Sequence, residues 1–365
     1  MLKSLLKNLL FLINIIFATG MLLSYSAPYV SPEIFWPLQL VGLAYPFWFW
    51  ANVFFAFLWI FRLNLKALLS VSVLLIGWNS IGKYVQIKLS RESPPPHAVK
   101  IMSYNVRLFD LYNWSNNTST RNKIFDMLVK QNPDIICFQE FFYSEKKGYF
   151  TTLDTLVKFQ KAKNVHAEHT NLKNGFHYFG KATFSAFPIV NKDIIDFKNQ
   201  DFNTCLITDI KIGKDTVRIF NAHLASVHFQ KNDYEFLNKA ISLNTEQQME
   251  GTKNILKRLK KGWILRAEQA EMIAEAIKQS PYPVIVCGDF NDSFNSYCYR
   301  VISEGLTDSF MESGNGFDIS YNGTWPAFRI DYILHDDRIK TYKFETVKEK
   351  LSDHYPITCY FEIVK

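Results

Sequence analysis

The sequence predicts an α/β protein whose soluble domain follows an N-terminal region of membrane-spanning helices. Residues 1–83 consist largely of apolar segments, whereas from Val99 onward short apolar runs of strand length alternate with helical patterns. Such alternation is expected when helices cover a sheet. The chain has 365 residues, which is enough for one large domain and an accessory region.

Three apolar segments predict the membrane region, at residues 9–25, 35–61 and 65–81. A helix needs about 20 apolar residues to span a bilayer. Pro46 is expected to kink the second segment. A cleaved signal peptide is the alternative for the first segment, because it has a basic start and ends near Ser24 and Ser26.

Basic residues predict the orientation of these segments. They lie before the first segment and between the second and third, which places both regions in the cytoplasm: Lys3, Lys7, Arg62 and Lys66. With three spans, the rest of a multi-pass chain would face the outer, extracytoplasmic side. Three basic residues after the third segment favour the opposite orientation: Lys83, Lys88 and Arg91. The net charge of +7 fits an anionic membrane surface or another anionic partner.

A proline-rich stretch over residues 84–98 predicts a linker. Pro94, Pro95 and Pro96 are consecutive and favour an extended, semi-rigid backbone. The expected organisation is therefore a membrane region over residues 1–83, this linker, and a soluble domain over residues 99–365.

Within the soluble domain, β-branched apolar runs predict strands and a 3.6-residue spacing predicts helices. The expected strands are residues 100–104, 134–139, 202–212, 216–222, 283–287, 329–335 and 355–363, and the expected helices are 121–131 and 265–279. The five cysteines lack the spacing of a zinc site.

Polar side chains stand at or beside the ends of five predicted strands. They are Asn105, Glu140, His223, Asp289 with Asn291, and Asp353 with His354, while Asp331 lies within a further strand. A single Asx residue after a strand is usually only a turn former. Repetition at successive strand ends predicts instead that these groups share one rim of the sheets, where α/β folds place their sites.

The chemistry of this set is specific. Glu140, Asp353 and Asn105 offer the oxygen ligands that Mg²⁺ prefers. His223 and His354 can exchange protons near neutral pH, and a carboxylate such as Asp331 can orient a histidine. Asp289 and Asn291 could direct a water and hold a phosphoryl oxygen. Together these roles predict metal-assisted hydrolysis of a phosphoester.

The motifs that carry these residues resemble, in order, those of the endonuclease/exonuclease/phosphatase superfamily, which includes DNase I-like nucleases, exonuclease III-like repair enzymes, sphingomyelinases and inositol polyphosphate 5-phosphatases. The matching motifs are residues 103–107, 133–140, 221–224, 288–291, 329–333 and 352–356. The resemblance spans nearly all of residues 99–365.

The resemblance implies a four-layer sandwich, with two face-to-face sheets flanked by helices. It assigns the metal-binding glutamate to Glu140, assisted by Asn105 and Asp353, and the catalytic histidine to His354, paired with Asp331. Asp289 would position or deprotonate the water or protonate the leaving group, and Asn291 would bind phosphate. His223 matches the DNase I-like and sphingomyelinase branches. The implied cofactor is Mg²⁺, with Mn²⁺ or Ca²⁺ as alternatives, and the implied partner is a phosphoester substrate.

Departures from the family pattern bear on the substrate. Arg107 stands where repair endonucleases usually carry Asp, which disfavours an abasic-site substrate; we assign substrate contacts to Arg107 and Tyr178. Residues 325–329 do not match the inositol 5-phosphatase signature, and Ala186 replaces a basic residue that is common in the family.

Several functions stay open at this point. The favoured one is a membrane-anchored, Mg²⁺-dependent hydrolase of phosphoester bonds, similar to a phosphodiesterase or endonuclease. A sphingomyelinase-like lipid phosphodiesterase or a phosphatase is the alternative, and nucleic acid and lipid headgroups both stay open as substrates. A degenerate module that binds phosphorylated ligands and a transport role for the membrane region are the alternatives from other classes. The lipid bilayer is an expected partner, and no obligate protein partner is indicated.

Overall fold

The computed structural model describes residues 2–364 apart from 147–148, 160, 174, 198–202, 228–232, 234–235, 237–244 and 324–327. Its contacts divide the chain into two compact units. The helical unit comprises residues 1–84, 226–268 and 293–301, and the sandwich unit comprises residues 85–225, 269–292 and 302–365. The boundary therefore passes through α10 (Thr245–Lys278), and the helical unit includes two segments from the second half of the chain.

The helical unit begins with α1 (Leu2–Ser26), the 3₁₀ turn η1 (Ala27–Tyr29), α2 (Pro32–Phe35), α3 (Pro37–Leu43), α4 (Tyr45–Phe61), α5 (Ala67–Ile76) and α6 (Trp78–Tyr84). Among the described residues, one uninterrupted helical stretch, Ser4–Tyr29, is long and apolar enough to cross a membrane. The pair α3 and α4 bends by 56° and the pair α5 and α6 by 71°, and each pair passes the same test only when it is counted as one span.

The two bends follow from the sequence. The first lies at Ala44, just before Pro46, where the proline ring cannot continue the hydrogen-bond ladder of the preceding helix. The second lies at Gly77, a residue that weakens a helix interior. The expected kink near Pro46 is confirmed, and the crossing of a membrane by all three segments stays a prediction.

A polar network crosses the apolar interior of the helical unit. The side-chain amide of Asn14 donates to the hydroxyl of Ser70 at 2.7 Å, and its carbonyl oxygen accepts from the indole of Trp59 at 2.9 Å. All three side chains are buried. Because a buried amide without partners is costly, this network ties α1, α4 and α5 in one register.

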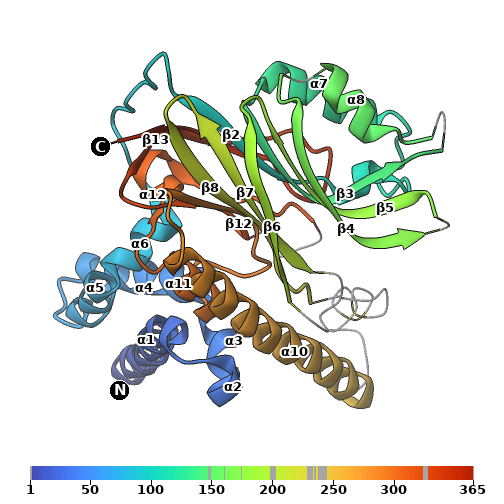
Figure 1. Cartoon of the computed structure of the whole chain (residues 1–365). Helices are drawn as coiled ribbons and strands as arrows, with labels where there is room; N and C mark the ends of the chain where they lie inside the picture. The colour runs from blue at the N-terminus through green and yellow to red at the C-terminus, as the bar shows by residue number, and fades with distance from the viewer. Residues whose placement is uncertain are drawn as a thin grey trace. The chain divides into compact units, whose positions relative to one another are not determined.

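The sandwich unit contains two mixed six-stranded sheets (Figure 1). The first has the order β13-β14-β2-β3-β5-β4, with β13 (Ile339–Thr346), β14 (Ile357–Ile363), β2 (Val99–Asn105), β3 (Ile135–Ser144), β5 (His177–Ser185) and β4 (Asn164–Lys173). The second has the order β10-β12-β9-β8-β7-β6, with β10 (Thr307–Asp308), β12 (Asp331–His335), β9 (Val284–Asp289), β8 (Asp215–His223), β7 (Thr204–Ile212) and β6 (Ile189–Asp196). The short strands β1 (Val85–Gln86) and β11 (Gly316–Phe317) form a separate pair.

Each sheet contains one parallel pair of strands near its centre. These pairs are β2 with β3 and β8 with β9, and the other pairs are antiparallel. A parallel pair needs a long crossover, which α7 (Thr120–Gln131) and α10 supply. The carboxyl ends of β2, β8 and β9 carry Asn105, His223 and Asp289.

The two sheets pack face to face around one hydrophobic core. Buried residues of both sheets meet there, including Ile101, Ile135, Ile219, Ile285 and Ile357. A second cluster covers the outer face of the first sheet and includes residues of α7 and α8 (Thr152–Phe159). Figure 1 shows these two helices over β3, β4 and β5. The predicted α/β sandwich with flanking helices is therefore confirmed.

The remaining short elements are η2 (Arg107–Asp110), α11 (Tyr297–Ser303) and α12 (Ser309–Ser313). The bounds of several elements differ from the prediction: α10 begins at Thr245 rather than 265, and β3 continues to Ser144 rather than ending at 139. β12 and β14 begin two residues later than expected, at Asp331 and Ile357. All five cysteines are buried and form no disulfide.

Candidate active site

Polar side chains from both sheets converge on one carboxylate oxygen of Asp289, Oδ2. Asn105 Nδ2 donates to it at 3.0 Å. His354 Nε2 and His223 Nε2 lie 3.6 Å and 3.7 Å from the same oxygen. The other carboxylate oxygen, Oδ1, accepts from the backbone N–H of Asn291 at 2.8 Å. Four of the predicted site residues are thus gathered around the fifth.

The local backbone explains why Asp289 can reach this position. Gly288 has a φ of 141°, and a Cβ at this residue would meet the carbonyl oxygen of Ala222 at 1.9 Å. Only glycine allows β9 to approach β8 so closely here. Asn291, with a φ of 52°, then turns the chain away, and its side-chain amide donates to Leu224 O at 3.0 Å.

Glu140 lies within β3 rather than after it. The strand register shifts between Phe138 and Phe141, and Glu140 itself has a φ of 48°. Such a bulge redirects a side chain that would otherwise follow the alternation of the strand. It brings Glu140 Oε1 to 3.3 Å from Asn105 Nδ2 and to 4.0 Å from His223 Nε2. The side chain stays 36% exposed.

The pKa of Glu140 is raised by loss of solvation and by the nearby carboxylate of Asp353. His354, Asn105 and Arg107 act in the opposite direction. Asp353 is 23% exposed, and its Oδ2 lies 3.3 Å from Arg107 Nε. Two carboxylates that repel each other at a solvent-accessible position are suited to a divalent cation, which would relieve the repulsion.

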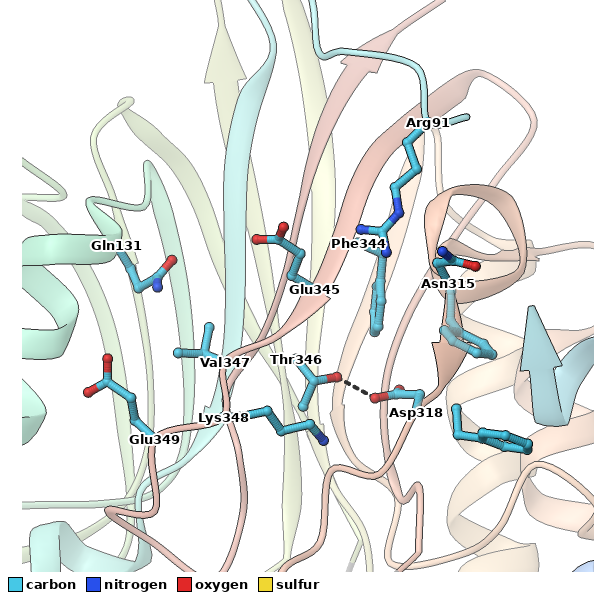
Figure 2. Close-up of a pocket in the computed structure, with 12 residues that line it drawn as sticks. Arg91, Gln131, Asn315, Asp318, Phe344, Glu345, Thr346, Val347, Lys348 and Glu349 are labelled. Carbon is cyan, nitrogen blue, oxygen red and sulfur yellow. Dashed lines mark hydrogen bonds between the residues drawn. The ribbon is translucent and has the colours of Figure 1, made fainter. Parts of the chain in front are cut away.

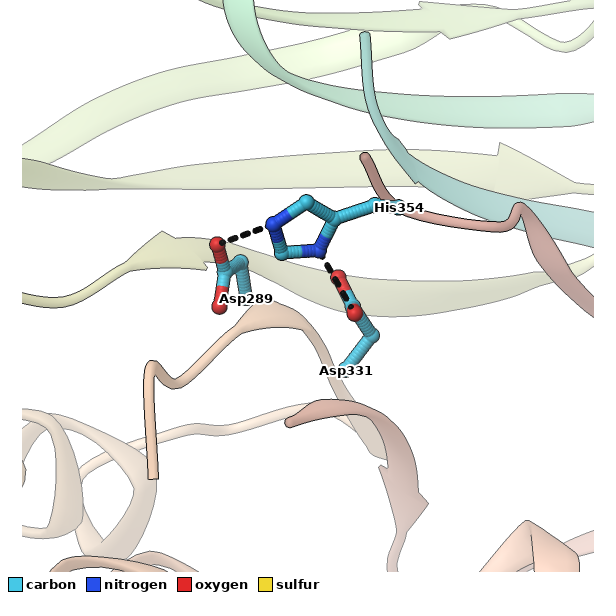
Figure 3. A group of neighbouring side chains, drawn as sticks. All are labelled: Asp289, Asp331 and His354. Atoms are coloured by element: carbon cyan, nitrogen blue, oxygen red, sulfur yellow. Dashed lines mark hydrogen bonds and ion pairs between the residues drawn. The ribbon is translucent and has the colours of Figure 1, made fainter. Parts of the chain in front are cut away.

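His354 and Asp331 form a buried pair (Figure 3). His354 Nδ1 lies 2.9 Å from Asp331 Oδ2. Burial alone would lower the pKa of His354, but Asp331 and Asp289 outweigh it and raise the pKa to about 10. His354 is therefore an imidazolium at neutral pH, with its Nε2 directed at Asp289.

The buried carboxyl group of Asp289 also has a raised pKa, but here burial is the main cause. Burial raises its pKa to about 7; His354 opposes this shift, and repulsion from Asp331 adds to it. Hydrogen bonds from Asn105 and from the Asn291 N–H also favour the ionised form. A carboxyl group that titrates near neutrality can accept and return a proton at physiological pH.

Asp289, Asp331 and His354 could also hold a metal ion. Each offers one ligand atom, and these atoms lie within 4.8 Å of one another. Asp331 Oδ1 is buried without a hydrogen-bond partner among the described residues, which leaves a lone pair available. The donor chemistry of the site, with carboxylates and an imidazole on one rim, thus fits a divalent ion.

Two predicted substrate contacts have other partners. Arg107 pairs with Asp353 and lies over the ring of Trp114, 4.6 Å from its centroid. Tyr178 stacks on Tyr143, with ring centroids 4.5 Å apart and an angle of 9°, and also contacts His169. Tyr178 also forms a hydrogen bond with the side chain of Glu145, and none of these partners is among the residues around Asp289.

Several supporting residues were not predicted. The hydroxyl of Ser320 accepts from the N–H groups of both Ile330 and Asp331 at 3.0 Å. The ring of Tyr321 packs edge-on against His354. Ser352 donates to Asn105 O at 2.9 Å and to Asp353 Oδ1 at 3.1 Å. Ser352 directly precedes Asp353 and could have been suspected; Ser320 and Tyr321 stand in no motif.

A buried amide pair joins the two sheets beneath the site. Gln139 Nε2 donates to Asn221 Oδ1 at 2.8 Å and to Ser103 Oγ at 3.2 Å. Asn221 Nδ2 in turn lies 3.2 Å from the carbonyl oxygens of Phe138 and Ala182. Since Gln139 precedes Glu140 directly, this network fixes the strand that carries the glutamate.

A separate pocket of about 470 Å³ lies along β13 (Figure 2). Its lining includes Arg91, Asp318, Phe344, Thr346 and Lys348. The hydroxyl of Thr346 donates to Asp318 within it. None of the predicted site residues lines this pocket.

Comparison with known families identifies the class of protein. Residues 102–354 match the model of the Endonuclease/Exonuclease/phosphatase family, and residues 7–84 match a domain of unknown function, DUF8431. The first match covers well over half of the chain, so the protein belongs to the endonuclease/exonuclease/phosphatase family. It is a metal-dependent phosphoesterase, a hydrolase of phosphate esters.

One curated relative is similar to part of the chain. The 3'-5'-exoribonuclease subunit Ccr4 of the CCR4-Not complex from Saccharomyces cerevisiae is 25% identical over 221 residues, which is 55% of this chain and 25% of that protein. The chain thus matches about a quarter of that relative's length.

Two solved structures share the fold. An endonuclease/exonuclease/phosphatase from Beutenbergia cavernae has a TM-score of 0.54 at 12% identity, covering 73% of this chain and 72% of that chain. A mannosyl-6-phosphatase from Bacteroides thetaiotaomicron has a TM-score of 0.53 at 17% identity, covering 73% and 100%. At these identities the likeness establishes the fold alone.

Proposed function

We propose that this protein is a membrane-anchored, Mg²⁺-dependent phosphodiesterase, with Mn²⁺ or Ca²⁺ as alternative ions. The observation that carries the proposal is the convergence of Asn105, His223 and His354 on one oxygen of Asp289, beside the partly exposed Glu140. Amide, imidazole and carboxylate groups on one rim supply both a cation site and proton carriers.

We place the ion at Glu140, Asp353 and Asn105. The competing group of Asp289, Asp331 and His354 is compact enough, but its two carboxylates favour the protonated form of His354 when no ion is bound, so a cation there would first have to displace that proton. Glu140 and Asp353 are also partly exposed, and Mg²⁺ usually keeps several of its waters. When bound, the ion would polarise a phosphoryl oxygen and offset developing negative charge.

The protein's own residues then carry out proton transfer and hold the substrate. Asp289, with its pKa near neutrality, accepts a proton from the attacking water. His354, held protonated by Asp331, donates a hydrogen bond to a phosphoryl oxygen. Asn291 and His223 are placed beside Asp289 to contact the phosphate and the leaving group. Arg107 and Tyr178 remain candidates for contacts with the rest of the substrate.

The substrate class is narrowed by chemistry and by relatives. The Ccr4 relative is named as an exoribonuclease, which supports a nucleic-acid diester. The mannosyl-6-phosphatase shares the fold and represents the phosphatase alternative. Attachment to a bilayer would favour a phospholipid headgroup, cleaved in the manner of a sphingomyelinase. A module that only binds phosphorylated ligands is the non-enzymatic alternative.

The experiment is a product assay on the full chain in detergent with Mg²⁺. RNA, single-stranded DNA, a phospholipid and a sugar phosphate are offered in parallel. Release of nucleotides supports the diester proposal, whereas release of phosphocholine or inorganic phosphate supports the lipid or phosphatase alternative. Binding of Mg²⁺ and RNA without any product would reject an enzymatic function.

We also propose that the chain is a multi-pass membrane protein with its sandwich unit on the extracytoplasmic side. The straight stretch Ser4–Tyr29 would form one span, and the two bent pairs would form the others. The positions of Lys3, Lys7, Arg62 and Lys66 support this orientation. The bilayer would then be a partner of the helical unit.

A further inference from the structure

The segment 293–301 follows the site loop directly in sequence, yet it belongs to the helical unit. Only Phe290, Asn291 and Asp292 separate Asp289 from its beginning. Its contacts with residues 24–84 are specific, and all of them lie within the helical unit.

Asn295 closes the ends of two helices. Its side-chain amide donates to Ser24 O at 2.9 Å and to Gly42 O at 3.5 Å. Ser24 lies in the last turn of α1 and Gly42 in the last turn of α3, where carbonyl groups lack partners within their own helix. Asn295 is 2% exposed, so these contacts form away from water, where an unpaired amide is costly.

Gln39 makes the reciprocal contact from the helical side. Its Oε1 accepts from the N–H of Tyr297, the first residue of α11, which has no acceptor inside that helix. Its Nε2 donates to Ala27 O at 2.9 Å and to Val30 O at 3.1 Å. Gln39 is 3% exposed and interrupts a long apolar segment. This contact with α11 gives a physical reason for a polar residue at that place.

Packing around these hydrogen bonds is tight. Phe294 packs edge-on against Tyr45, with ring centroids 5.3 Å apart, and also contacts Tyr84 at 5.9 Å. A Cβ on Gly42 would meet both the Cβ of Ala27 and the backbone oxygen of Asn295 at 2.7 Å, so a larger residue cannot be accommodated without movement of the backbone. The segment is therefore held by side chains, by backbone groups and by close approach.

The other end of the same stretch is held within the sandwich unit. Phe290 N donates to Ile330 O at 2.8 Å, and the hydroxyl of Tyr332 donates to Asp292 O at 3.0 Å. Asp292 and Phe294 are separated by one residue, so little slack remains between the two attachments. Only Ser293 lies between the two attached residues.

We propose that residues 7–84, beyond any role in membrane attachment, serve as the docking partner that fixes the loop of Asp289 and Asn291. The inference gives a function to a domain for which none is assigned. It rests on the proposed roles of Asp289 and Asn291 in catalysis. It implies that detaching the N-terminal helices from segment 293–301 lowers turnover and loosens the loop.

The test compares two glycine substitutions in the full chain in detergent. Gly42→Ala introduces a methyl group against both Asn295 O and Ala27 Cβ, whereas Gly20→Ala introduces one only between N-terminal helices, against the ring of Trp48 at 2.8 Å. We expect Gly42→Ala to lower kcat about tenfold, because small displacements of catalytic groups are costly, and to speed amide hydrogen exchange over residues 289–301. Gly20→Ala should change neither quantity.

A second variant avoids added bulk. Asn295→Ala removes the two bonds to the helix ends and should reproduce the faster exchange and the lower kcat. Equal effects of Gly42→Ala and Gly20→Ala, or unchanged exchange in both Gly42→Ala and Asn295→Ala, would overturn the docking proposal. An inactive wild-type protein would instead refute the proposed function, while the exchange measurement would still decide the docking.

Discussion

The two halves of the site differ in their access to water. On one side, Asp289, Asp331 and His354 are nearly closed off, with side chains 1%, 1% and 6% exposed. On the other, Glu140 and Asp353 keep 36% and 23% of their side chains exposed. The difference teaches that acidic groups only a few ångströms apart can be suited to different tasks: the closed half shares protons, and the open half can receive a hydrated cation.

The largest expected effect concerns the open half. Glu140→Gln should lower activity by about 10³ and abolish tight Mn²⁺ binding measured by calorimetry, because it removes a charged ligand from the proposed ion site. Glu349→Gln is the matched control, since Glu349 is 38% exposed and pairs only with Lys130 in the described ion pairs. Retention of Mn²⁺ affinity in Glu140→Gln, with its loss in Asp331→Asn, would move the ion to the closed half.

The next effect concerns the closed half. His354→Gln should lower kcat by about 10²–10³, the usual cost of removing a hydrogen-bond donor that stabilises charge in the transition state, while Mn²⁺ affinity changes little. His97→Gln serves as the control, because His97 is largely exposed and contacts Glu362 outside the site. A fall in Mn²⁺ affinity as large as that in Glu140→Gln would erase the distinction between the halves.

Stability should depend on pH through the closed half. The pKa of His354 is raised to about 10 from its ordinary 6.5, so its contribution to stability is complete below pH 6.5 and is lost as pH rises through 10. In chelator, the free energy of unfolding should fall over this window by about 1–3 kcal/mol more in the wild type than in His354→Gln. Equal slopes for the two proteins in urea titrations would contradict the assignment.

The smallest effect should come from Arg107. Arg107→Met removes the ion pair with Asp353 and should raise the KM about twofold to fivefold, since partly exposed ion pairs contribute about 1 kcal/mol or less. Arg338→Met removes a comparable pair with Asp336 outside the site and is the control. A loss as large as that of Glu140→Gln would make Arg107 a direct participant instead.

Much of the fold was predictable because the sequence of each strand is itself typical of a strand. Asn105, His223 and Asp289 end apolar, β-branched runs, and those runs became β2, β8 and β9. The meeting of His223 with Asp289 follows from the rule that parallel neighbours, here β8 and β9, end at the same edge of a sheet. Asn105 reaches Asp289 from the other sheet. The roles of the individual site residues stay predictions, since only their positions are described.

Other features could not be predicted from local sequence, because they depend on contacts between residues that are far apart in the chain. Glu140 looked like the end of a strand, but a bulge lets β3 continue to Ser144. The bond from Asn295 to Ser24 joins residues 271 positions apart, and no periodicity encodes such a contact. Similarly, Ser320 supports Asp331 from a loop without a motif.

The burial of every cysteine offers a route to the orientation of the protein in a membrane. Cys137, Cys205, Cys287, Cys298 and Cys359 are all inaccessible, so the native chain should be silent toward a thiol reagent that cannot cross a bilayer. Lys214, exposed at the turn between β7 and β8, could then be replaced by a single reporter in Lys214→Cys. Labelling in intact cells would locate the sandwich unit outside, and labelling only after lysis would locate it inside.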